Sequence, residues 1–176
     1  MADARRADRA AAGVGQRVYI SDTNIWSHFR HGGLLAELFA LPIVFASTDF
    51  VLVELPEVEV AELQARGLLV EVLEGAEVTA LYELTAEHNN SSLADVSCYF
   101  VAKQKGFPLL TGDGQLRKQA AKDGLEVRGA LWLLDQLIAH QVIATAHAAA
   151  ALQAMLDAGA RLPPADCEQR MAAWLA

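Results

Sequence analysis

Four acidic residues stand at positions where a site for divalent cations would form: Asp22, Glu54, Asp95 and Asp113. Asp22 and Asp113 each follow a short apolar run and precede a helical pattern, which predicts that both end a strand. Hard divalent cations prefer oxygen ligands, and Mg²⁺ commonly takes one or two carboxylates together with water and substrate phosphate. Such an ion can orient and activate a water molecule and offset charge on a phosphate. Four acids brought to one place would therefore suit metal-dependent hydrolysis of a phosphate ester.

The elements that must position these acids alternate between strand and helix patterns. Short apolar or alternating runs predict strands at 18–20, 43–46, 68–73, 109–110 and 125–127. Helical patterns occupy 24–30, 50–55, 57–64, 76–88, 92–105, 115–122, 129–140, 144–158 and 164–174. This alternation predicts a parallel sheet with right-handed crossovers, that is, a three-layer α/β/α fold. In open sheets of this kind ligands bind beyond the carboxyl ends of the strands, where Asp22 and Asp113 are expected.

Length and composition are those of one domain with a substantial apolar core. The chain has 176 residues, 53% of them apolar, and contains no internal repeat. No apolar run reaches the roughly 20 residues that span a bilayer, and residues 1–16 lack the apolar segment of a signal peptide. We therefore expect a cytoplasmic protein outside the membrane, with residues 1–16 as a flexible extension. Cys98 and Cys167 lack metal-ligand spacing and are expected to be reduced structural thiols.

The net charge of −8 argues against a general nucleic-acid binder, which is usually basic. It does not exclude a metal-dependent nuclease, because bound cations reverse the sign of an acidic site. Basic residues do flank the last two acids, at Lys103, Lys105, Arg117, Lys118 and Lys122. They are either a solvated helix face or contacts to an RNA backbone.

Each acid also has a simpler structural interpretation. Asp95 closes the stretch Ser92-Leu93-Ala94-Asp95, a capping box with Asp in place of Glu, and could serve only a helix N-terminus. Asp22 could cap the first helix, Asp113 could be a turn residue, and Glu54 could be an ordinary solvated acid. His28 and His31 have no evident partner and are expected at the surface. Four unrelated structural roles would, however, have to place all four acids at the same edge of one sheet. A shared site accounts for this more simply.

Four short motifs resemble the PIN domain family, metal-dependent ribonucleases that include the VapC-type toxins of bacterial toxin–antitoxin pairs. They are Ile20-Ser21-Asp22-Thr23-Asn24, Val51-Leu52-Val53-Glu54-Leu55, Ser92-Leu93-Ala94-Asp95-Val96 and Leu110-Thr111-Gly112-Asp113-Gly114. The resemblance implies that the four acids bind Mg²⁺ or Mn²⁺ and carry the catalysis. It also implies that Asn24 and Thr111 line the site. Together with the nearby Arg117 and Lys118, they are the expected substrate-binding residues.

The resemblance covers about residues 17–140, and some 35 residues follow where VapC-type toxins end. We therefore expect a nuclease domain over 17–140 and a C-terminal helical extension over 141–176 packed on the same domain. The resemblance, and the many apolar positions between 144 and 175, also predict a homodimer.

The predicted function is a metal-dependent endoribonuclease that cleaves single-stranded RNA, with a toxin role and an antitoxin partner as further implications of the resemblance. An alternative is a catalytically inactive PIN-like module that binds a protein partner. An inactive module, however, would not need all four acids. A phosphohydrolase of the haloacid-dehalogenase type is discounted, because it needs a second Asp where the chain has Asn24.

Overall fold

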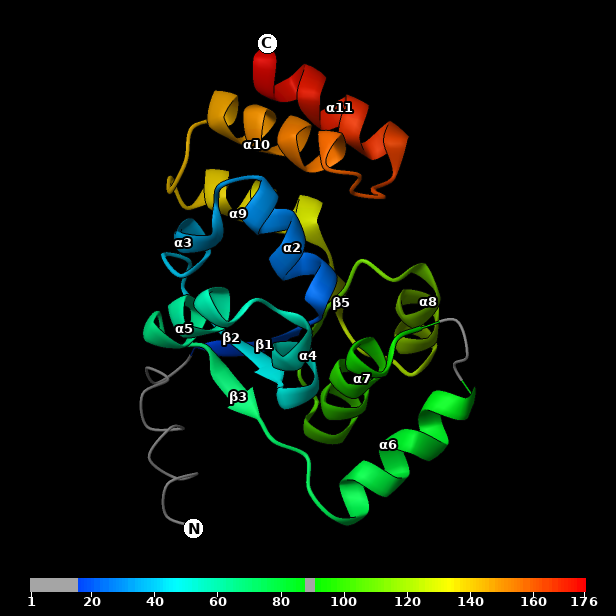
Figure 1. The fold of residues 1–176 in the computed structure, drawn as a ribbon. Coiled ribbons are helices and arrows are strands. Elements are labelled where there is room, and N and C mark those ends of the chain that lie inside the picture. Colours follow the sequence, from blue (N-terminus) through cyan, green and yellow to red (C-terminus); the bar gives the residue numbers. More distant parts are fainter. Residues whose placement is uncertain (1–15, 88–90) are drawn as a thin grey trace.

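A parallel sheet of five strands, in the order β3-β2-β1-β4-β5, lies at the centre of the fold (Figure 1). The computed structural model describes residues 16–87 and 91–176, so the predicted extension lies almost wholly outside the described residues. The strands are β1 (Arg17–Ser21), β2 (Ile43–Thr48), β3 (Leu69–Glu71), β4 (Leu109–Leu110) and β5 (Val127–Arg128). Every neighbouring pair is parallel. The predicted parallel sheet is confirmed, and β1 lies in its middle.

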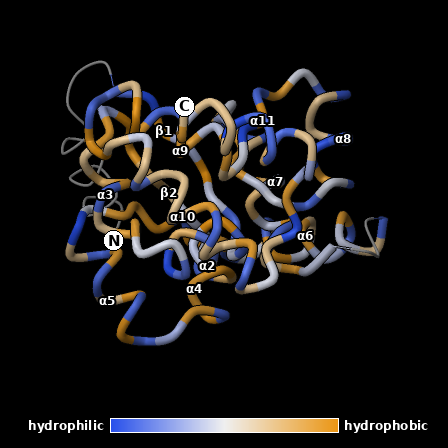
Figure 2. The backbone as a smooth tube through the Cα atoms, turned by 90° about the horizontal axis from the view of Figure 1, so that it is seen from above, coloured by the Kyte–Doolittle hydropathy of each residue, from blue (hydrophilic) through white to orange (hydrophobic). Residues whose placement is uncertain are grey.

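Helices cover both faces of this sheet and complete the predicted three-layer α/β/α fold (Figure 1). They are α2 (Thr23–His31), α3 (Leu35–Leu38), α4 (Asp49–Glu54), α5 (Glu57–Ala65), α6 (Ala76–Glu87), α7 (Leu93–Lys105), α8 (Gly114–Lys122), α9 (Ala130–Ala139), α10 (Thr145–Asp157) and α11 (Pro164–Leu175). Helix α7 packs along β1, β2 and β4, whereas α2, α3 and α9 pack against one another. The chain alternates between hydrophobic and hydrophilic stretches (Figure 2), as expected of elements with one face in the core.

Strands β1 and β2 are longer than predicted, whereas β3 is shorter and β5 is displaced along the chain. The differences in β3 and β5 each have a local cause. Strand β3 is shorter than predicted, because β2 pairs with it only up to Thr48, where α4 begins. Strand β5 begins two residues late, because the amide of Leu125 donates to the carbonyl of Ala120 and closes the end of α8. Gly124, with a φ of 75°, permits this turn.

The C-terminal helices α10 and α11 pack on each other and, through α10, on α2 and α9 (Figure 1). Helix α10 buries five apolar side chains against the same chain: Ala148, Ala149, Ala151, Leu152 and Met155. The approach to α2 is close, since a Cβ atom on Gly32 would lie 2.7 Å from the Met155 side chain. The apolar face of α10 is therefore buried within the same chain and gives no reason to expect a second subunit. The homodimer remains a prediction that rests on the family resemblance.

Two smaller findings concern the cysteines and the helices of the described residues. Cys98 and Cys167 are free, buried thiols. Among the described helices, none is both long and apolar enough to cross a membrane.

Arg170 ties α11 to the body of the fold through Asp135 of α9. Its Nε lies 3.1 and 3.0 Å from the two carboxylate oxygens, and its Nη2 lies 2.7 Å from Oδ2. Because the pair is only partly exposed, we expect Arg170→Ala to lower the free energy of unfolding by about 1 kcal/mol, or roughly 2–4 °C in Tm. The control is Arg66→Ala, which removes an exposed ion pair within α5 and should cost less than about 0.5 kcal/mol. Equal losses in thermal unfolding would contradict a special role for Arg170.

Candidate metal centre

Asp22 lies directly beyond β1 and is fully buried. Its Oδ1 accepts the amide of Ile25 at 3.0 Å and so caps α2. Its Oδ2 accepts the hydroxyl of Thr111 at 2.6 Å and the amide of Gly112 at 3.1 Å. The capping interpretation therefore accounts for one oxygen, while the other binds the segment that follows β4. Burial raises the pKa of Asp22 to about 6, although these three hydrogen bonds act in the opposite direction.

The end of β1 is fixed by interactions with three other elements. The carbonyl of Ser21 accepts the hydroxyl of Ser47 at 2.6 Å and the thiol of Cys98 at 3.3 Å. Ser47, at the end of β2, also accepts the indole N–H of Trp26 at 3.3 Å. Asp22 consequently projects from a rigid position, in which the carboxyl ends of β1 and β4 are held side by side.

Asp95 lies in the first turn of α7 and is 7% exposed. The helix cap is Ser92, whose hydroxyl accepts the Asp95 amide at 3.1 Å. The Oδ1 atom of Asp95 is buried and has no hydrogen-bond partner in the described parts of the chain. Burial, followed by the charge of Asp22, raises the pKa of Asp95 to about 7. The carboxylates of Asp113 and Glu54 raise this pKa further, so the other three acids all act on Asp95.

Asp113 is the N-cap of α8 and not merely a turn residue. Its Oδ1 accepts the amides of Gln115 and Leu116, each at 2.8 Å. Its Oδ2 accepts the hydroxyl of Ser91 at 3.0 Å. The amide of Asp113 in turn donates to the Thr111 hydroxyl at 3.0 Å, which links this acid to the partner of Asp22.

Glu54 is the last residue of α4 and is exposed. Its Oε2 accepts the hydroxyl of Thr23 at 2.6 Å, and Thr23 follows Asp22 directly. The bond brings a carboxylate from the helix after β2 to the end of β1. A purely solvated Glu54 is therefore ruled out in this structure.

The four acids gather around the carboxyl ends of β1 and β4, and three of them hydrogen-bond to their own chain. In residues 16–87 and 91–176, no three His, Cys, Asp or Glu side chains are placed closely enough to hold a metal ion as they stand. The donor set nevertheless fits a hard cation, because Asp95 Oδ1, near the buried carboxylate of Asp22, has no partner among the described residues. Burying such charges without compensation is costly, and a cation would compensate them.

The predicted substrate residues lie around the same strand ends. Thr111 is fully buried and its hydroxyl is engaged with Asp22, so it holds that carboxylate in place and is not free for substrate. The Nη1 atom of Arg117 donates to the Thr111 carbonyl at 3.1 Å. Lys118 and Asn24 are exposed. The Cβ atom of Asn24 lies 3.4 Å from where a Cβ on Gly112 would stand.

The flanking basic residues do not form one surface. Lys103 pairs with Asp123 at 3.2 Å, and Lys105 pairs with Glu71. Both lie near the far end of α7, and ten residues of helix place Lys105 about 15 Å from Asp95. Of the predicted basic set, Arg117 and Lys118 are the members beside the acids.

Sequence reasoning placed His28 at the surface, and the structure corrects this. His28 is half-buried, and its Nδ1 atom is buried without a hydrogen-bond partner in the described residues. Burial lowers its pKa. The spacing from Asn24 was the available signal, because residues four apart lie on the same face of a helix, here beside the segment after β4.

A family model described as a PIN domain matches residues 18–174, which include α10 and α11. No curated protein matches the chain.

Proposed function

The chain belongs to the PIN domain family, and from this premise we propose that it is a metal-dependent endoribonuclease of single-stranded RNA. The family supplies the coarser part of this statement, a fold of the nuclease type. The match runs through α11, so the C-terminal helical pair belongs to the family pattern. RNA as substrate, and Mg²⁺ or Mn²⁺ as the ion, are part of the proposal.

The observation that carries the proposal is the pair of buried carboxylates, Asp22 and Asp95, at the carboxyl edge of the sheet. The pKa of Asp22 is about 6 and that of Asp95 about 7, because both lose water and Asp95 also feels the charge of Asp22. Glu54 and Asp113 lie close enough to raise the pKa of Asp95 as well. Perturbed acids grouped in this way are typical of functional sites.

In the proposed enzyme the four acids, Asp22, Glu54, Asp95 and Asp113, would hold Mg²⁺ or Mn²⁺. When bound, the ion supplies Lewis acidity and an activated water for phosphodiester hydrolysis. The chain's own hydroxyls set the orientation of the acids: Thr111 fixes Asp22, Thr23 fixes Glu54 and Ser91 fixes Asp113. Rotamers locked in this way reduce the rearrangement that binding requires.

The test is cleavage of a 5′-labelled, unstructured RNA by the purified protein in Mg²⁺, in Mn²⁺ and in excess EDTA. We expect internal cleavage with either ion and none after chelation, restored when Mn²⁺ is added back. Cleavage that persists in EDTA, or intact RNA under every condition, would contradict the proposal. The toxin role, the antitoxin and the homodimer remain predictions. A short neighbouring reading frame that encodes a DNA-binding antitoxin would support the first two.

A further inference from the structure

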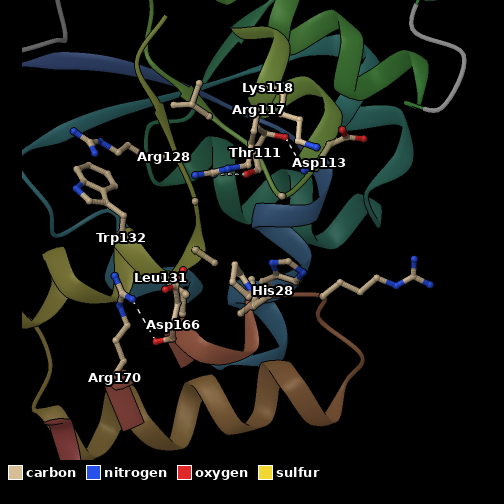
Figure 3. Close-up of a pocket in the computed structure, with 18 residues that line it drawn as sticks. His28, Thr111, Asp113, Arg117, Lys118, Arg128, Leu131, Trp132, Asp166 and Arg170 are labelled. Atoms are coloured by element: carbon tan, nitrogen blue, oxygen red, sulfur yellow. Dashed lines mark hydrogen bonds between the residues drawn. The ribbon is translucent and has the colours of Figure 1, made fainter. Parts of the chain in front are cut away.

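A groove of about 920 Å³ opens beside the candidate metal centre (Figure 3). It lies between the segment after β4 and the start of α11, so the nuclease core forms one wall and the C-terminal helices form the other. In Figure 3 the wall beside the metal centre carries Thr111, Asp113, Arg117 and Lys118, and the opposite wall carries Asp166 and Arg170 of α11. Leu131 of α9 and His28 of α2 lie between the two walls.

The charge of this groove is opposite to that of the chain. The described lining residues include five bases, Arg117, Lys118, Arg128, Arg161 and Arg170, and two acids, Asp113 and Asp166. The whole chain has 14 Lys and Arg against 22 Asp and Glu. A third of the chain's basic residues thus lines one groove, and an anion would be attracted to it in spite of the net charge of −8.

Two of these bases form no ion pair with an acidic side chain of the described residues. Arg170 binds Asp135, Arg128 binds Glu126, and Arg117 donates to a backbone carbonyl. Lys118 and Arg161 are exposed, and neither pairs with an acid within residues 16–87 and 91–176. They lie on opposite walls, Lys118 on α8 and Arg161 in the segment 158–163 between α10 and α11. An extended polyanion in the groove could contact both.

Apolar side chains complete the lining. Leu131, Leu162 and Pro163 line the groove together with the basic residues. A ligand with regularly spaced charges and flat apolar faces suits such a surface, and single-stranded RNA has both, in its phosphates and its bases. Asp113 belongs both to the groove and to the candidate metal centre. The groove therefore leads to the place where cleavage is proposed.

We propose that this groove binds the RNA segment adjoining the scissile phosphate, with Lys118 and Arg161 on backbone phosphates. The C-terminal helices then form one wall of the substrate site. The inference rests on the proposed function. It adds the path of the RNA strand across the protein surface.

The test measures binding in EDTA, where no cleavage interferes. The probe is a fluorescein-labelled 12-nucleotide RNA of mixed sequence, and the readout is fluorescence anisotropy between 0.05 and 0.5 M salt. The variants are Lys118→Ala, Arg161→Ala and the double variant. The matched controls are Lys122→Ala, one turn further along α8 and outside the groove lining, and Arg66→Ala, at the residue that follows α5.

A single-strand phosphate contact contributes about 0.7 to the slope of log Kd against log salt, which corresponds to roughly fivefold in affinity at 0.1 M salt relative to 1 M. We expect each single variant to lose about fivefold and about 0.7 of slope, and the double variant about 25-fold. The control variants should bind like the wild type. Both substituted side chains are exposed, so the fold should be unaffected.

Three outcomes would overturn the inference. Unchanged affinity and slope in the double variant would remove the groove from RNA binding, while metal-dependent cleavage by the wild type would leave the proposed function standing. A wild-type protein that neither binds nor cleaves RNA would contradict both the groove inference and the proposed nuclease function. Binding of a labelled oligo-glutamate peptide that depends on Lys118 and Arg161, without binding of RNA, would make the groove a protein-docking surface.

Discussion

Replacing Asp113 by asparagine is expected to lower the rate of RNA cleavage by more than about 100-fold while the fold stays intact. Asparagine caps a helix as well as aspartate does, so the amides of Gln115 and Leu116 keep their acceptor. The substitution removes one of the four negative charges that would hold the cation. Losing even an outer partner of a metal ligand typically costs 10–100-fold, so loss of a ligand should cost more.

The measurement compares Mn²⁺-dependent cleavage and thermal unfolding of the two proteins. Asp157→Asn is the matched control, because it removes an exposed carboxylate at the end of α10, far along the chain from the acids. The control should cleave RNA at the wild-type rate. If Asp113→Asn also keeps its rate within a few-fold, Asp113 is only a helix cap.

Replacing Asp95 by asparagine is expected to stabilise the metal-free protein at pH 8 and to remove most of its stabilisation by Mn²⁺. The folded-state pKa of about 7 lies well above the ordinary 3.8, so folding favours the protonated acid. The stability linked to this proton is fully present below about pH 3.8 and is lost as the pH rises through 7. Asparagine carries no charge to bury. At about 1.4 kcal/mol per pKa unit, we therefore expect a gain of about 4 kcal/mol at pH 8, or roughly 8–16 °C in Tm.

The free energy of unfolding also falls with rising pH because of Asp22, whose pKa is about 6. At about 1.4 kcal/mol per pKa unit, this carboxyl group accounts for a loss of about 3 kcal/mol between pH 4 and 7. Thermal unfolding in EDTA should therefore show a wild type that weakens over this range, and an Asp95→Asn variant that weakens less. Mn²⁺ should stabilise the wild type more at pH 8 than at pH 5, because protons compete for the same oxygens. Asp157→Asn should respond to Mn²⁺ as the wild type does. A wild type indifferent to Mn²⁺ at both pH values, with Asp95→Asn less stable in EDTA, would make the carboxylate structural.

The sheet edge could be predicted from local pattern alone. Apolar runs that stop at Asp22 and just before Asp113 predict strand ends, and parallel pairing places such ends together whatever the details of packing. The hydrogen bond from Thr111 to Asp22 follows from that pairing. The helix cap predicted at Ser92 is also found at the start of α7, because capping depends on a few neighbouring residues.

The direction of individual side chains could not be predicted in this way. Glu54 reaches Thr23, and Asp95 Oδ1 has no partner within residues 16–87 and 91–176. Both depend on how α4 and α7 pack against the sheet, which the local sequence does not specify. His28 was wrongly placed at the surface, because α10 and the segment after it cover α2 from more than 100 residues further along the chain. The tail helices themselves were predicted nearly within a residue, but a helical pattern does not specify which neighbour the helix covers.

The bond from Thr111 to Asp22 also has a consequence during synthesis of the chain. Its two residues are 89 positions apart, so a ribosome that adds 5–20 residues per second makes the second roughly 4–18 s after the first. Strand β4, which brings Thr111 to Asp22, has to leave the exit tunnel before it can pair with β1. Until then Asp22 of the nascent chain lacks both its hydrogen-bond partner Thr111 and the nearby acid Asp113. A product that ends before residue 107 lacks both Thr111 and Asp113, so under the proposed function we expect no nuclease activity from unfinished copies of the chain.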